Sequence, residues 1–121
     1  MGLNPGDILH IYCIFTKPFP KYKFVICICP ISSLFFLINS KPRRNTLDAQ
    51  IIIKKADYSF LTDDSYINTA TICTFGQPEL GKAKKVGSLS NSLRGEIVKV
   101  TKKIRYLTPL LKELISKNFS L

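Results

Sequence analysis

The sequence predicts an α+β fold that is mainly β, in which a small β-barrel precedes a helical C-terminal segment. Five short apolar runs rich in β-branched and aromatic residues are separated by clusters of Pro, Ser and Lys. Apolar residues then recur every three or four positions toward the C-terminus, as in a helix. A length of 121 residues fits one compact domain. We therefore expect a single domain over residues 1–121, with the barrel at 5–75, a loop at 76–87 and the helical segment at 88–117.

The barrel is predicted from the number and spacing of its strands. The expected strands cover residues 8–15, 24–29, 34–39, 50–53 and 69–75. Pro30-Ile31-Ser32-Ser33 joins the second strand to the third and has the length of a hairpin connection. Five short strands in so few residues favour a closed or nearly closed barrel.

The C-terminal third has the periodicity of helices. Its apolar stripe consists of Leu89, Leu93, Ile97, Val100, Ile104, Leu107 and Leu111. The possible N-caps of the first helix are Ser88, Ser90 and Ser92. Pro109 cannot continue this helix, so we expect a break near residues 106–108 and a second helix over 109–116. Thr108 is the expected cap of the second helix.

The charge of the chain points to an anionic partner. The formal net charge is +10, and the cations lie mainly toward the two ends while the middle is acidic. Clustered Lys and Arg gain free energy by displacing counterions from phosphates, so a nucleic acid or an acidic protein is favoured, although simple solubility explains such a charge as well. Lys outnumbers Arg, which favours nonspecific attraction to phosphate over bidentate reading of bases.

The four cysteines say more about the cellular compartment of the protein than about metal binding or catalysis. All four lie in apolar, strand-like runs without the paired C-x-x-C spacing of structural zinc sites. Cys27 and Cys29 are two positions apart on a strand, so we expect them to point the same way. We expect no metal and no cofactor, and the lack of a disulfide pattern favours the cytoplasm. The longest apolar stretch, residues 24–39, is broken by Pro30 and two serines, so we also expect no membrane span.

One loop combines cations with aromatic rings. Residues 17–23 read Lys-Pro-Phe-Pro-Lys-Tyr-Lys and connect the first two expected strands. Such side chains hold a phosphate backbone and stack on unpaired bases, as RNA-binding proteins require. The candidate RNA-binding residues are Lys17, Lys21, Tyr22, Arg43 and Arg44. The two arginines follow the third strand and can also be interpreted as ordinary solvated loop charges.

The order of the elements and the residues that begin them resemble the MazF/PemK toxin family. The matching segments are Pro5-Gly6-Asp7-Ile8 at the first strand, Phe24-Val25-Ile26-Cys27-Ile28 after a basic loop end, Ile38-Asn39-Ser40, and Gly87-Ser88-Leu89-Ser90 before the last helix. The resemblance implies a homodimer of SH3-like β-barrels that cleaves single-stranded RNA without metal. It also implies an antitoxin partner in a type II toxin–antitoxin system.

The resemblance places a catalytic site on three residues of this chain. The family's catalytic Arg falls on Lys23, and the Pro that usually follows it is Phe24 here. The family's Thr or Ser at the end of the third strand falls on Asn39 or Ser40, depending on register. Lys supplies a point charge where the planar fork of Arg holds two phosphate oxygens, so a Lys site is expected to bind RNA and to cut it slowly.

Two function classes follow from these residues. The first is a toxin-like, metal-independent endoribonuclease that leaves 2′,3′-cyclic phosphate ends. The second is a noncatalytic barrel of the same shape that binds nucleic acid or a partner protein through its Lys-rich helix. His10, the only histidine, is open to two interpretations, a general base or a structural residue on the half-polar face of the first strand.

Overall fold

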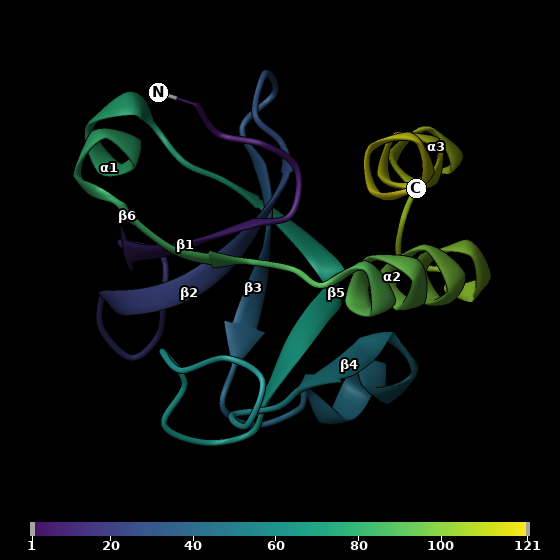
Figure 1. Cartoon of the computed structure of the whole chain (residues 1–121), viewed down its shortest axis with the longest axis horizontal. Helices are drawn as coiled ribbons and strands as arrows, with labels where there is room; N and C mark the ends of the chain where they lie inside the picture. Colours follow the sequence, from purple (N-terminus) through teal and green to yellow (C-terminus); the bar gives the residue numbers. More distant parts are fainter. Residues whose placement is uncertain (1, 121) are drawn as a thin grey trace.

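The computed structural model describes residues 2–120 and has one curled, six-stranded sheet with helices on both sides (Figure 1). The strands are β1 (Asp7–Cys13), β2 (Lys21–Cys29), β3 (Leu34–Asn39), β4 (Gln50–Ile53), β5 (Ser65–Thr74) and β6 (Lys84–Ser88). Their order in the sheet is β4-β5-β3-β2-β1-β6, and every neighbouring pair is antiparallel. The predicted mainly β fold with C-terminal helices is confirmed in this form, as a half-barrel sheet.

The bounds of β3 and β4 agree with the prediction, whereas the prediction of a loop at residues 76–87 was wrong. This segment contains the short helix α1 (Gln77–Lys82) and the edge strand β6, which pairs with β1. The sequence of β6 is Lys-Lys-Val-Gly-Ser, so it lacks the alternation of apolar residues by which strands are recognised. Its pairing depends on the exposed backbone edge of β1, which a local pattern does not reveal.

Irregularities in the strand pairing curl the sheet. Register shifts occur between β1 and β6, between β2 and β3, and between β3 and β5. Such bulges bend a strand and increase its twist. The bulge between Cys27 and Cys29 also interrupts the alternation of side chains along β2. Cys27 packs into one apolar cluster and Cys29 into the other, on the opposite face of the sheet. The expectation that these two thiols point the same way was therefore wrong.

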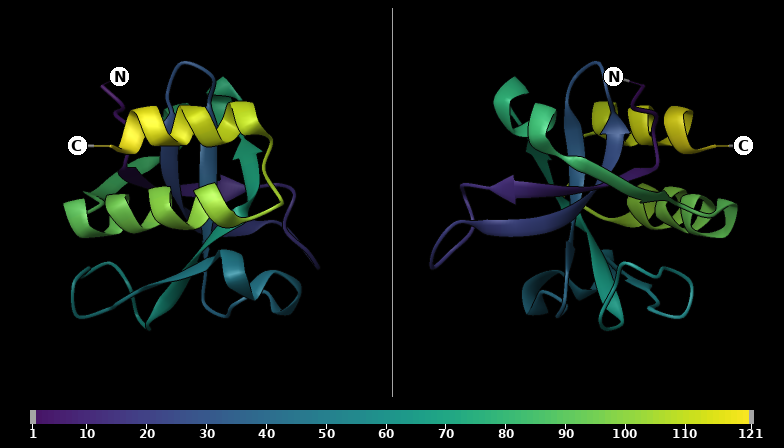
Figure 2. Two further views of the ribbon diagram at one scale, coloured as in Figure 1. Left: turned by 90° about the vertical axis from the view of Figure 1, so that its right-hand side faces the viewer. Right: turned by 60° about the vertical axis from the view of Figure 1, so that its left-hand side comes forward.

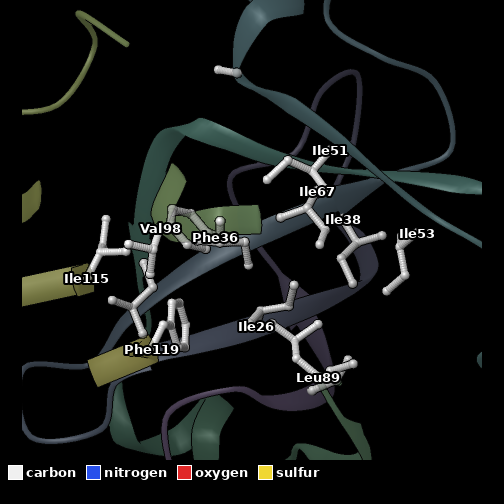
Figure 3. Packing of buried hydrophobic residues seen from close by; sticks show 14 of the residues in the cluster. Ile26, Phe36, Ile38, Ile51, Ile53, Ile67, Leu89, Val98, Ile115 and Phe119 are labelled. Carbon is white, nitrogen blue, oxygen red and sulfur yellow. The ribbon is translucent and has the colours of Figure 1, made fainter. Parts of the chain in front are cut away.

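Both faces of the sheet are covered by apolar packing. The larger cluster lies between the sheet and the helices α2 (Asn91–Lys103) and α3 (Pro109–Phe119). Figure 3 shows Phe36 of the sheet near Val98 of α2 and Phe119 of α3. The second cluster lies on the other face and includes Leu80 of α1. Because successive side chains of a strand point to opposite faces, β2 supplies both clusters and reads as a continuous apolar run.

The C-terminal helices begin as the sequence predicts. The Ser90 hydroxyl accepts a hydrogen bond from the Leu93 amide at 3.2 Å, and the Thr108 hydroxyl accepts one from the Leu111 amide at 3.2 Å. Each helix therefore has a side-chain N-cap, and the predicted break before Pro109 is confirmed. Helix α3 continues beyond the predicted end at residue 116 and stops at Phe119.

Figure 2 shows α2 and α3 side by side on one side of the sheet, while the loop between β1 and β2 extends away from them. This arrangement leaves the ends of β2 and β3 near that loop uncovered by α2 and α3, and the 3-10 helix η1 (Arg44–Ala49) follows the end of β3. Among residues 2–120, no helix combines the length and the apolar character needed to cross a membrane.

The Pro-Gly-Asp motif holds three segments of the chain together. Gly6 adopts a φ of +90°, which favours glycine. Its amide donates to the Cys27 carbonyl at 2.8 Å, and its carbonyl accepts from the Leu89 amide at 2.9 Å. The motif thus joins the start of β1 to β2 and to the segment that enters α2.

Candidate functional site

A basic pocket of about 450 Å³ lies where β2 begins and β3 ends. Antiparallel pairing brings these two strand ends together, since Phe24 of β2 is opposite Ile38 of β3. The cations that line the pocket are Lys17, Lys21, Lys23, Lys41 and Arg43. Lys21 and Lys23 reach it together because residues two apart on a strand point to the same face.

The basic pocket has no compensating negative charge among the described residues that line it. Within residues 2–120, the ion pair in the structure joins Lys85 to Asp7, and neither of these residues lines the pocket. Five cations around one hollow repel each other, so an anion that enters lowers the electrostatic energy of all of them. The arrangement is that of an anion-binding site.

Lys23 and Asn39 form the polar floor of the basic pocket. The Lys23 Nζ donates a hydrogen bond to the Asn39 Oδ1 at 2.7 Å. This contact uses the oxygen of the amide. The nitrogen of the same amide, Asn39 Nδ2, is buried and has no hydrogen-bond partner within the described part of the chain. An unpaired buried donor costs about 1–3 kcal/mol. Because this nitrogen is buried, an acceptor such as a phosphate oxygen would reach it only after the Asn39 side chain turns toward the pocket.

The environment of Lys23 also changes its acidity. Burial lowers the pKa of the Lys23 ammonium below its usual value, and the nearby charges of Lys21 and Arg43 lower it further. Lys23 therefore reaches its neutral, basic form at a lower pH than an exposed lysine does. A neutral amine that is still held by Asn39 through an N–H keeps its lone pair free to accept a proton.

The structure brings most of the predicted site residues together. The six of them that line the basic pocket are Lys17, Lys21, Lys23, Asn39, Ser40 and Arg43. Arg44 lies outside it and lines an adjoining hollow that shares Arg43. Tyr22 is not among the residues of the pocket, because its side chain alternates to the other face of β2.

His10 lies with Tyr22 rather than with the lysines. Its ring stacks on the Tyr22 ring with centroids 4.9 Å apart, and it is not among the residues that line the basic pocket. The structure therefore gives His10 a packing role and no position from which to act as a base in that pocket. Sequence reasoning also missed Lys41, although it begins the basic run Lys41-Pro42-Arg43-Arg44 directly after β3.

The lowered pKa of Lys23 predicts a pH-dependent stability. Between its pKa in the folded protein and the higher value in the unfolded chain, the unfolded state binds more protons, so the free energy of unfolding rises as pH rises. Lys23→Met removes this contribution. We expect its stability relative to the wild type to be greatest at neutral pH and to decline as the pH rises toward the ordinary pKa of lysine, as urea denaturation would measure.

Lys55→Met is the matched control, because Lys55 is exposed and lies in a turn away from the basic pocket. It removes one lysine without removing a buried ammonium. If the stability of Lys23→Met relative to that of Lys55→Met did not vary with pH, a lowered pKa at Lys23 would be contradicted.

Comparison with known proteins identifies no family for this chain. No protein-family model and no curated protein matches the chain. Among residues 2–120, no three His, Cys, Asp or Glu side chains are grouped so that they could hold a metal ion. The basic pocket is therefore the feature of this chain that indicates a function.

Proposed function

We propose that this protein is a toxin-like, metal-independent endoribonuclease that acts on single-stranded RNA, and that the basic pocket holds the phosphate at the cleaved bond. One observation supports this proposal above all. Lys21, Lys23 and Arg43 surround a hollow that is also lined by Asn39 and Ser40. A phosphate group has both the charge and the acceptor oxygens that this set of side chains lacks.

The pocket offers a group for each step of cleavage by the RNA's own 2′-hydroxyl. Neutral Lys23 accepts the proton of that hydroxyl, and the 2′-oxygen forms a bond to phosphorus as the bond to the 5′-oxygen breaks. Arg43 and the Asn39 amide hold the phosphorane oxygens, and the Lys21 ammonium gives a proton to the departing 5′-oxygen. The products are a 2′,3′-cyclic phosphate and a 5′-hydroxyl.

The residue types of the basic pocket favour a slow enzyme. A neutral Lys23 amine adds no charge to the phosphate, whereas a guanidinium at this place would bind two phosphate oxygens at once. Ser40 lines the pocket and can donate a third hydrogen bond. Binding is therefore expected to be stronger than catalysis.

RNA cleavage in EDTA tests the proposal. We expect end-labelled single-stranded RNA to yield fragments with 2′,3′-cyclic phosphate ends, and Lys23→Ala to reduce the rate about a hundredfold because it removes the base. Lys55→Ala, which removes an equal charge far from the pocket, should cut at the wild-type rate. Equal cleavage by Lys23→Ala and the wild type would assign the activity to another site.

A second function is favoured by one feature of the same pocket. Neither a carboxylate nor a histidine is among the described residues that line it, so the only candidate base is Lys23. A noncatalytic barrel that binds nucleic acid or a partner protein needs no base at all. Intact RNA in the same assay, with binding that weakens steeply as salt is raised, would support this alternative.

The proposed partners follow from the toxin-like function. An antitoxin would present acidic side chains to the basic pocket and compete with RNA for it. A homodimer and a cytoplasmic location belong to the same proposal. An acidic peptide that displaces RNA, and the mass of the protein in solution measured by light scattering, would test the two protein partners.

A further inference from the structure

A second hollow adjoins the basic pocket across the edge of β2. It has a volume of about 230 Å³, and it shares Lys21, Lys23 and Ser40 with the basic pocket. We call it the aromatic hollow, because Tyr22 and Phe24 are among the residues that line it. Thr62 and Ser65, from the segment that leads into β5, also line it. The two hollows therefore meet at the same three polar residues.

The edge of β2 between the two hollows is open. Residues 21–23 pair with β1, where Tyr22 is opposite Tyr12, whereas the pairing with β3 begins only at Phe24. This part of β2 is thus hydrogen-bonded on one side. A flexible chain can cross the free side from the basic pocket to the aromatic hollow without displacing a strand.

The Tyr22 ring is exposed and is held in position by other rings. Tyr22 is 60% exposed. The His10 ring stacks on it at 4.9 Å with 20° between the planes, and His10 also contacts Phe24, with centroids 5.0 Å apart. Phe24 in turn packs against the partly buried Phe60 at 4.7 Å. An aromatic ring that neighbouring rings already hold in place loses little conformational entropy when it stacks on a planar ligand.

We propose, on the basis of the proposed function, that the aromatic hollow is a base-binding subsite, in which the base next to the bound phosphate stacks on Tyr22. In single-stranded RNA a sugar separates the phosphate from its base, so the two groups can lie on opposite faces of a single β-strand. Along β2 the lysines and the aromatic rings alternate in direction, and Lys21 and Lys23 lie where the two hollows meet. This division matches a nucleotide that wraps over the strand edge, with its base unpaired.

Binding of a short single-stranded RNA, followed by fluorescence anisotropy, tests the subsite. Tyr22→Ala is expected to weaken binding about tenfold, because stacking of one base is lost. Tyr22→Phe keeps the ring and should bind within about twofold of the wild type. Tyr106→Ala is the matched control, since Tyr106 is 44% exposed and lines neither hollow. An RNA whose bases are replaced by abasic sites should bind the wild type and Tyr22→Ala equally.

The salt dependence separates the stacking contribution from the phosphate contribution. Tyr22 carries no charge, so Tyr22→Ala should leave the slope of log affinity against log salt unchanged, whereas Lys21→Ala should reduce it by about one. Intrinsic tyrosine fluorescence gives a direct signal, because the chain contains five tyrosines and no tryptophan. RNA should quench the emission of the wild type more strongly than that of Tyr22→Phe.

The outcomes distinguish a failed subsite from a failed function. If RNA binds through Lys21 and Lys23 while Tyr22→Ala binds as the wild type does, the subsite is overturned and the proposed function stands. If the wild type binds no RNA at any salt concentration, both are overturned. If Tyr22→Ala changes the molecular mass in solution and leaves RNA affinity unchanged, the exposed ring belongs to a contact between two copies, and the subsite is overturned.

Discussion

Phe119→Ala is expected to lower the free energy of unfolding by about 4 kcal/mol. Phe119 is the last residue of α3 and is 1% exposed. Its ring packs against the Phe36 ring of β3, with centroids 6.5 Å apart, and the Arg94 guanidinium of α2 lies 5.9 Å from its centre. Removal of the ring leaves a cavity where the sheet and both helices meet, and it frees the end of α3 to separate from the sheet.

Denaturation by urea, followed by circular dichroism, measures this loss. Leu110→Ala is the control on the same helix, because Leu110 is 77% exposed and should change the stability by less than about 0.5 kcal/mol. Phe119→Leu should lie between the two, since it retains part of the buried volume. Equal stabilities of Phe119→Ala and Leu110→Ala would mean that α3 is not docked in solution as the structure has it.

Asp7→Ala is expected to lower the free energy of unfolding by about 3 kcal/mol. Asp7 is 3% exposed, and both oxygens of its carboxylate have hydrogen-bond partners. It accepts from the Asn4 amide at 2.9 Å and from the Ser88 hydroxyl at 3.2 Å, and the Lys85 Nζ lies 3.2 Å from it. Alanine would remove two hydrogen bonds to a charged acceptor and one ion pair, and would release β6 from its side-chain contacts with β1.

Lys85→Ala is the matched control for the Asp7 substitution. The Lys85 side chain is 52% exposed, so loss of its ion pair should cost no more than about 1 kcal/mol. Asp7→Asn keeps the size and one acceptor oxygen, and it should lie between Lys85→Ala and Asp7→Ala. If all three variants were equally stable, the carboxylate would not be what holds β6 at the edge of the sheet.

The Asp7 contacts also explain what the Pro-Gly-Asp motif contributes to the resemblance. Gly6 and Asp7 bond to β2, to β6 and to the segment that enters α2, and neither residue lines the basic pocket. The motif therefore has a structural role at the start of the first strand. It supports the expected barrel, whereas support for RNA cleavage comes from the basic pocket alone.

The fold was predictable where its signals are local. Apolar runs, the capping serine and threonine, and Pro109 each act within one turn or one strand, so β3, β4 and the break between α2 and α3 were found from the sequence. The edge strand β6 was missed, because four of its five residues are lysine, glycine or serine and it is held by β1 through the backbone. An edge strand of this kind has no periodicity of its own.

The sequence by itself determined which residues carry the charge and that they stand at strand ends, so six of the predicted site residues line one pocket. Only the tertiary structure decided which of them meet. The Lys23–Asn39 hydrogen bond joins residues 16 positions apart, and the lowered pKa of Lys23 depends on burial and on charges brought from another loop. The bulge that separates Cys27 from Cys29 likewise depends on how β2 pairs with β3. Tyr22 turns away from the lysines because residues 21–23 belong to β2 rather than to the expected loop. A bulge and the extent of a strand are decided where two segments pair, so one segment read by itself does not reveal them.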